Sequence, residues 1–193
     1  MCKLTVCHHP MNKWSRGLPL IAFMPLAFLF MINVHEIGHT VFAQLLGDRA
    51  ATYHLYERYP SGGFCLGCNT YDHNQLSTWG NLLTAAGGVL FTQAVAIAVL
   101  LLRRTRVKNS AARRLTAILA VVFVLDMPLQ VLQAFRIDVA DQPYPTQVDL
   151  VDFTRLISGE TNMSASAIQI AVLGVLIVYV LWIVRLYRVR HKL

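Results

Sequence analysis

Charged residues are scarce in this sequence. Asp, Glu, Lys and Arg make up 14% of its 193 residues, whereas a soluble domain of this size usually carries about 25%. This shortage excludes a disordered chain and a coiled coil, and four cysteines are too few for a disulfide-dense secreted module. With 55% hydrophobic residues and a mean hydropathy of +0.49, the chain is expected to form one compact membrane-embedded domain over 1–193.

Several enzyme motifs are also missing. The sequence contains no P-loop, no dinucleotide fingerprint and no Gly-x-Ser-x-Gly. We find no internal repeat and no low-complexity segment. These absences argue against a nucleotide-dependent enzyme, a serine hydrolase of the common type and a repeat protein.

Four apolar stretches are long enough to cross a bilayer, which takes about 20 residues. They cover residues 18–46, 79–102, 115–135 and 165–184. Glu36 is the only acidic residue between Gly17 and Gly47, and Asp126 is the only charge between Leu115 and Phe135. The sequence therefore predicts an all-α polytopic membrane protein with four transmembrane helices.

The basic residues indicate the orientation of these helices. Lys and Arg gather before the first span, between the second and third, and after the fourth; the middle cluster is Arg103, Arg104, Arg106, Lys108, Arg113 and Arg114. The other two loops hold two basic residues each. By the positive-inside rule both termini are expected in the cytoplasm. The net charge of +7 then faces anionic lipid headgroups, and no nucleic-acid partner is expected.

Two segments outside the spans have patterns of their own. Residues 51–58 are rich in aromatic and β-branched types, and a Pro60–Gly63 turn separates them from residues 64–71, which predicts a small β-hairpin in the first extracytoplasmic loop. Cys65 and Cys68 lie in it; a local disulfide and a structural zinc site completed by histidines are both open. Residues 148–157 have the apolar spacing of a short amphipathic helix.

The motif that carries chemistry is His35-Glu36-Ile37-Gly38-His39, an H-E-x-x-H pattern inside the first span. Residues i and i+4 share one helix face, so both imidazoles can reach a single metal ion. Neutral imidazole and carboxylate suit Zn²⁺, and Glu36 lies where it can take a proton from a water that the ion activates. Ionisable groups inside a membrane are costly and usually functional. We therefore expect one zinc ion per chain, with Glu36 catalytic; a polar patch that holds helices together is the alternative.

The stretch from His35 to Gly47, His-Glu-Ile-Gly-His-Thr-Val-Phe-Ala-Gln-Leu-Leu-Gly, resembles the site-2 protease family of intramembrane zinc metalloproteases in its compact bacterial form. Thr84-Ala-Ala-Gly-Gly-Val-Leu90 is similar to that family's small-residue motif. The resemblance implies an endopeptidase in a bacterial inner membrane that cuts a membrane-embedded or membrane-adjacent protein. It also implies a hairpin whose edge holds the substrate by backbone hydrogen bonds.

The third metal ligand is left open by the sequence. The family's Leu-Asp-Gly is absent, and Asp126 is one candidate. His39 is 8 residues from Gly47 and Asp126 is 10 residues from Arg136, which places both roughly 12–15 Å below the same end of their helices. The topology therefore favours Asp126.

Asp149 is an equal candidate, because its surroundings resemble a segment that precedes the last helix in some compact relatives, although it would have to dip inward from an outer loop. Asp152 is a less favoured third. For both, the plain alternative is a carboxylate in the first turn of a helix, where acidic residues are stabilising.

Asn81 and Gln93 of the second span are candidates for binding the substrate backbone, with interhelical hydrogen bonding as the more ordinary role. The alternative function for the whole chain is a membrane binding or chaperone-like protein that keeps the peptidase scaffold without turnover. Oligomeric state, substrate and pathway are not indicated by the sequence.

Overall fold

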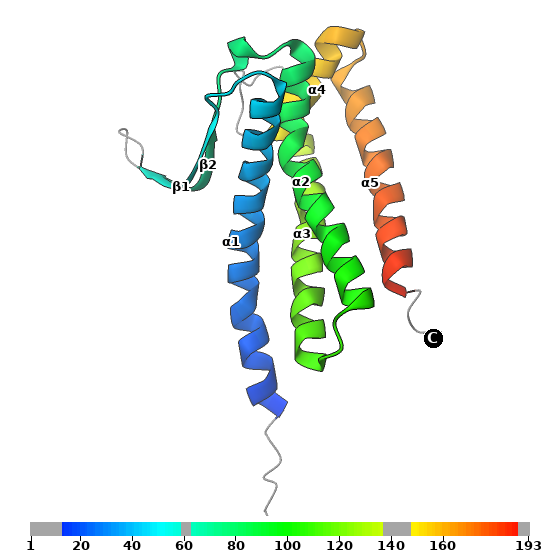
Figure 1. Ribbon diagram of the computed structural model, residues 1–193. Coiled ribbons are helices and arrows are strands. Elements are labelled where there is room, and N and C mark those ends of the chain that lie inside the picture. Colours follow the sequence, from blue (N-terminus) through cyan, green and yellow to red (C-terminus); the bar gives the residue numbers. More distant parts are fainter. Residues whose placement is uncertain (1–12, 59–62, 137–147, 189–193) are drawn as a thin grey trace, which may run out of the picture.

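The computed structural model describes residues 13–58, 63–136 and 148–188, and Figure 1 shows their arrangement. Four long helices run roughly along one direction, with a two-stranded hairpin beside the first and a shorter helix before the last. In chain order the elements are α1 (Lys13–Leu46), β1 (Thr52–Arg58), β2 (Phe64–Thr70), the 3₁₀ turn η1 (His73–Gln75), α2 (Thr78–Thr105), α3 (Ser110–Arg136), α4 (Asp149–Thr161) and α5 (Ala165–Arg188).

The predicted fold class is confirmed. Four helices are long and apolar enough to cross a membrane: Ala22–Leu46, Thr78–Thr105, Ser110–Arg136 and Ala165–Tyr187. They match the four expected spans and indicate an integral membrane protein. The outermost basic residues, Lys3 at one end and Arg190 and Lys192 at the other, lie outside the described residues.

The hairpin lies along the side of α1, as Figure 1 shows, and does not simply cap the end of that helix. The hydroxyl of Tyr53 on β1 donates to Asn33 of α1. Gly67 of β2, at φ +70°, packs against that same residue, and a Cβ on it would lie 3.3 Å from Oδ1 of Asn33. Asn33 is 13 residues before the end of α1 at Leu46, or roughly 20 Å at 1.5 Å per residue. The hairpin therefore reaches well below the end of the bundle at which α1 finishes, which we call the distal end.

A disulfide joins Cys65 to Cys68 within β2. The two positions therefore pair locally. The zinc site left open by the sequence would be completed by His54 and His73; in the structure His54 forms a hydrogen bond with Thr52.

Glycines bring α1 and α2 into close contact. A Cβ on Gly38 would lie 2.6 Å from the backbone oxygen of Gly87, and a Cβ on Gly87 would lie 2.9 Å from the ring of Phe42. Both distances are too short for a real side chain, so the two backbones approach each other only because these positions are glycine. The Gly-Gly pair of the second span therefore fixes the distance between α2 and the His35–His39 face of α1.

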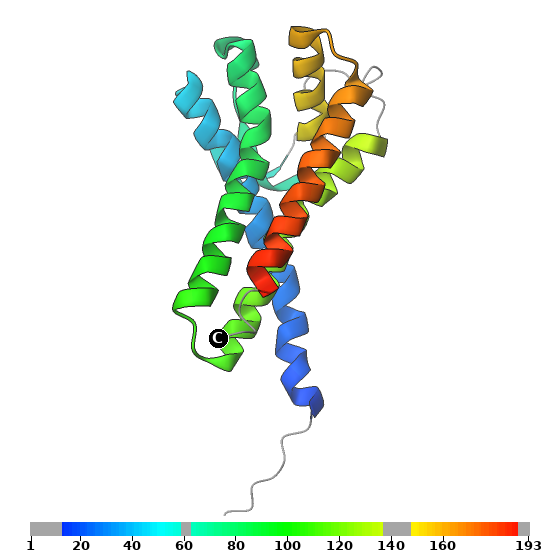
Figure 2. The same ribbon diagram turned by 90° about the vertical axis from the view of Figure 1, so that its right-hand side faces the viewer.

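Helix α4 brings its first residue back toward the centre of the bundle. Figure 2 shows α4 running outward to the distal end, where the chain turns and returns as α5. Asn162 ends α4 in the left-handed conformation, at φ 57°, which is a common way to stop a helix. The amphipathic helix expected over 148–157 is thus present, and its N-terminal end, Asp149, is the end that points inward.

Candidate metal centre

His35 and His39 are both buried on the face of α1 that meets α2 and α3, with 6% and 3% of their surfaces exposed. One nitrogen of each ring is held by an acceptor from a neighbouring helix. The Nδ1 atom of His35 lies 2.8 Å from Oδ2 of Asp126 on α3, and Nδ1 of His39 lies 2.7 Å from the backbone oxygen of Thr84 on α2. A backbone oxygen only accepts, so the His39 ring carries a proton on Nδ1, and its Nε2 offers a lone pair when the ring is neutral.

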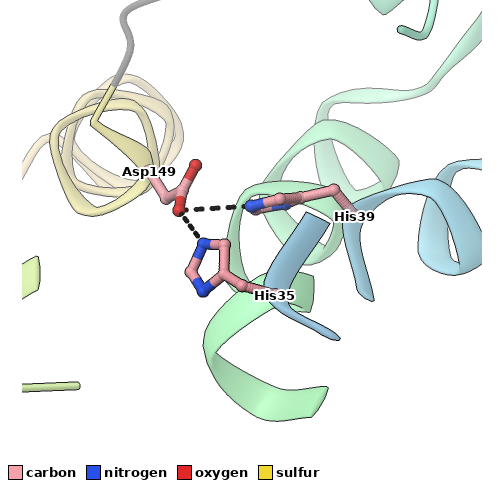
Figure 3. A group of neighbouring side chains, drawn as sticks. All are labelled: His35, His39 and Asp149. Carbon is pink, nitrogen blue, oxygen red and sulfur yellow. Dashed lines mark hydrogen bonds and ion pairs between the residues drawn. The ribbon is translucent and has the colours of Figure 1, made fainter. Parts of the chain in front are cut away.

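The two remaining ring nitrogens face the same carboxylate, as Figure 3 shows. Oδ2 of Asp149 lies 2.7 Å from Nε2 of His35 and 3.2 Å from Nε2 of His39. Burial raises the pKa of the Asp149 carboxyl, but protonated His39 and His35 rings, through charge and hydrogen bonding, outweigh this and hold that pKa below its usual range. Asp149 thus directs one carboxylate oxygen at two imidazole nitrogens.

These three atoms form a set that can hold a metal ion. The ligand atoms of His35, His39 and Asp149 all lie within 4.8 Å of one another. Around a tetrahedral zinc ion with bonds near 2.0–2.1 Å, ligand atoms are about 3.3 Å apart. When both rings are neutral, three acceptors converge here without a donor between them, an arrangement that a cation stabilises. The donor set, two imidazoles and one carboxylate, is also one that zinc accepts in sites that keep a coordination position open.

Gly88 of α2 completes the pocket around the two nitrogens. A Cβ at this position would lie 2.5 Å from Nε2 of His35 and 2.5 Å from Nε2 of His39. Only glycine leaves that space free, and the space adjoins both ligand atoms. The small-residue segment of the second span therefore serves the site directly as well as the packing of α1 against α2.

The structure gives the three candidate carboxylates different places. Asp149 lies with the two imidazoles, whereas Asp126 lies on the other side of the His35 ring and also accepts a hydrogen bond from the Thr92 hydroxyl at 2.5 Å. A carboxylate on the second nitrogen of a metal-binding imidazole fixes the ring's tautomer and orientation. Asp152, one turn along α4, lines the cavity beside the cluster but is not part of it.

Glu36 lies next to the cluster on the wall of a polar cavity of about 630 Å³. The side-chain amide of Asn69 on β2 donates to its Oε2. The cavity also contacts His39, Asp149 and the whole length of β2. The hairpin thus holds one carboxylate oxygen of Glu36. Glu36 lies where the polar cavity adjoins His39 and Asp149.

Asn81 and Gln93, the two candidate substrate-binding residues, make hydrogen bonds within the protein. The Asn81 amide donates to the backbone oxygen of His73 at 2.9 Å, which fixes the segment that leads from the hairpin into α2. The Gln93 amide donates to the backbone oxygen of Phe123 on α3 at 2.9 Å and accepts from the Tyr179 hydroxyl of α5 at 2.6 Å. Gln93 therefore joins α2 to α3 and α5, whereas Asn81 holds the segment that precedes its own helix.

Sequence reasoning missed Asn69 and the Thr84 carbonyl. The only available signal for Asn69 was a polar residue in the predicted hairpin strand, and a backbone carbonyl leaves no signal in a sequence. Comparisons of the chain with protein-family models, curated proteins and solved structures find no match.

Proposed function

We propose that this chain is a membrane-embedded zinc peptidase that hydrolyses a peptide bond of a transmembrane or membrane-adjacent protein. The observation that carries the proposal is the arrangement of the two histidines. Each ring is fixed through Nδ1 by an acceptor, so that both Nε2 atoms point at the Asp149 carboxylate. The resemblance of the His35–Gly47 stretch to the site-2 protease family supports the same function.

The roles of the residues follow from their positions. His35, His39 and Asp149 would hold the ion, which supplies a Lewis acid for the scissile carbonyl and lowers the pKa of water. Glu36 takes a proton from the attacking water as the water oxygen bonds to the carbonyl carbon, and returns it to the nitrogen as the carbon–nitrogen bond breaks. Asn69, through its hydrogen bond to Oε2 of Glu36, holds this carboxylate in place and leaves Oε1 for the proton.

The hairpin offers a place for an extended substrate. A helix hides its own peptide bonds, whereas an unpaired strand edge binds an extended chain through backbone hydrogen bonds. In the described part of the chain the sheet has two strands, so β2 has one edge that no strand covers. Consecutive β2 residues with alternating side-chain directions, among them Cys68, Asn69 and Thr70, line the cavity that contains Glu36. Such a lining is that of a strand edge, since a sheet face would contribute every second residue.

The distribution of Lys and Arg supports a topology with both termini in the cytoplasm, and we propose a bacterial inner membrane as the location. The hairpin and α4 then lie on the extracytoplasmic side, where a Cys65–Cys68 disulfide is stable. The lipid bilayer is the expected environment, and nucleic acid is not an expected partner.

The test begins with metal content. Protein purified in detergent and supplied with zinc is expected to hold about one zinc ion per chain by mass spectrometry. His39→Ala and Asp149→Ala should lose it, whereas Asp152→Ala, one helical turn away, should keep it. A wild-type protein without metal, or an Asp149→Ala variant that retains it, would contradict the assigned ligand set.

A second variant separates metal binding from catalysis. Glu36→Gln is expected to keep its zinc and to lose cleavage of a transmembrane test peptide by about 10²–10⁴-fold, the range for a general acid–base group. Asn74→Ala changes an exposed residue in the segment after the hairpin. It is the control for losses of activity caused by substitution and purification alone. Cleavage at the wild-type rate by Glu36→Gln would exclude the mechanism. Zinc binding with no cleavage by any form would favour the non-catalytic binding protein.

A further inference from the structure

A second cavity, of about 390 Å³, lies directly behind the candidate metal centre. Asp149 and Ala85 line both this cavity and the polar one that contains Glu36. The two spaces therefore share a wall, and one residue of that wall is a member of the metal-holding cluster.

The two cavities differ in chemistry. The surface turned into the second one is entirely apolar, whereas the first contacts three carboxylates and two imidazoles. The lining of the apolar cavity comes from α2, α3, α4 and α5 and includes Leu90 of α2, Phe153 of α4 and Val172 of α5. An apolar space is stable when filled by an apolar group, because water in it would find no hydrogen-bond partner.

Residues of α2 and α5 line the cavity from two sides. Figure 2 shows these two helices diverging toward the distal end. At the other end they are joined, through the bond between Tyr179 and Gln93 and through the Arg103 guanidinium, which lies 4.7 Å from the centre of the Tyr187 ring. Leu90 and Val175, at the two sides of the cavity, are 49% and 61% exposed on helices that span the membrane. A group from the bilayer therefore reaches this cavity sideways, without crossing a polar surface.

We infer that this cavity is the subsite for a large apolar side chain of the substrate, on a residue next to the bond that is cut. The inference rests on the proposed function and adds a substrate class to it: transmembrane segments with Leu, Met, Phe or a similar residue at the cleavage position. A cavity of roughly 150 Å³ already holds a benzene ring, so the present volume accepts any of these side chains. The shared wall at Ala85 and Asp149 places the residue's backbone at the metal centre when its side chain is seated.

The experiment is photocrosslinking, which needs no turnover. A single-span Leu/Ala peptide with one diazirine-bearing leucine at its centre is reconstituted with the full chain in phosphatidylcholine vesicles. The Glu36→Gln variant is used so that the peptide stays intact. Crosslinks located by mass spectrometry are expected on the two sides of the cavity, at Ala86 and Val172.

Filling the cavity should remove these crosslinks. Ala171→Trp from α5 and Leu90→Trp from α2 each add bulk to the cavity lining, and each should reduce the crosslinks by about tenfold. Val178→Trp is the matched control, since Val178 is 67% exposed on α5 and does not line the cavity. Peptide crosslinks that are absent from the cavity, or unchanged in both filled variants, would overturn the inference. So would labelling of the cavity by a diazirine phospholipid that the peptide does not displace, which would make it a lipid site.

These results are separable from those on the proposed function. If crosslinks form in the cavity but the zinc-loaded wild type cleaves nothing, the peptidase function is refuted and the cavity is a peptide-docking site. If the protein cleaves in a zinc-dependent way but no crosslinks form in the cavity, the peptidase function is supported and this subsite is refuted. When both hold, cleavage products of the wild type should carry a large apolar residue beside the cut, and those of Ala171→Trp should shift toward small residues.

Discussion

Gly88→Ala tests the metal centre with a single methyl group. The added Cβ would lie 2.5 Å from Nε2 of both His35 and His39, whereas ordinary contacts begin at 3.4 Å. Each ring must therefore retreat by 0.9 Å, the difference between these two distances. Metal–ligand distances tolerate about 0.2 Å, and the rings do not retreat freely because Asp126 and the Thr84 carbonyl hold their Nδ1 atoms.

We expect Gly88→Ala to weaken zinc binding by at least about 100-fold, or about 2.7 kcal/mol. The assay is competition with a chromophoric chelator on detergent-purified protein. Gly174→Ala is the control, since a Cβ at that glycine of α5 meets nothing within 4 Å. Thermal unfolding of the metal-free forms shows whether the variant folds. A folded Gly88→Ala protein that binds zinc within about threefold of wild type would refute the placement of the ion between the two Nε2 atoms.

Two further variants test the assigned contacts. Asp126→Asn should keep zinc but bind it about 10–100-fold more weakly, because the partner of the His35 ring is altered while the ligands remain; complete loss of metal by the same chelator assay would mean that Asp126 is itself a ligand. Gln93→Leu should lower the free energy of unfolding by about 1–3 kcal/mol, because Tyr179 and the Phe123 carbonyl lose a buried partner. Unchanged zinc affinity in Gln93→Leu, measured beside its denaturation, distinguishes a packing role from a role in the site.

The part of the site that lies on one helix was predictable. Residues four apart share a face at 3.6 residues per turn, so His35 and His39 had to point the same way once the span was recognised. Depth counted along two helices also brought Asp126 to the level of the histidines, and the structure places it against His35. Depth does not tell which ring nitrogen a carboxylate meets. That depends on the rotation of α3 about its axis, which packing decides.

The local sequence pattern around Asp149 predicts its secondary structure but not its contact with the histidines. Its sequence context indicates the first turn of an amphipathic helix, and it occupies the first position of α4. Its approach to His35 depends on how deeply α4 begins beside α2, a matter of long-range packing. The position of the hairpin also depends on long-range packing. The turn and strand signals predict two paired strands, as the structure has them. They do not predict that Asn69 of β2 donates a hydrogen bond to Glu36 of α1.

The charge of the site makes metal removal a test of stability as well as of function. Asp126 and Asp149 flank one imidazole, and Glu36 lies beside them; carboxylates gathered in a membrane-embedded interior are costly unless cations accompany them. A zinc ion supplies that compensation, and so do protons on the two rings. Free zinc at 100 times its dissociation constant should therefore add about 2.7 kcal/mol of stability, raising the unfolding temperature by roughly 5–10 °C.

The size of this zinc effect should depend on pH. Protons compete with zinc for the ring nitrogens, so at a fixed zinc concentration the increase should be larger at pH 8 than at pH 6. These two values lie about 1.5 units above and about 0.5 units below the pKa of imidazole in peptides, which is about 6.5. Scanning fluorimetry with and without chelator at the two pH values measures it, and His39→Ala serves as the control that should show no increase. An unfolding temperature that zinc leaves unchanged at both pH values would mean that protons alone compensate the carboxylates, and that the cluster is a buried ion pair rather than a metal centre.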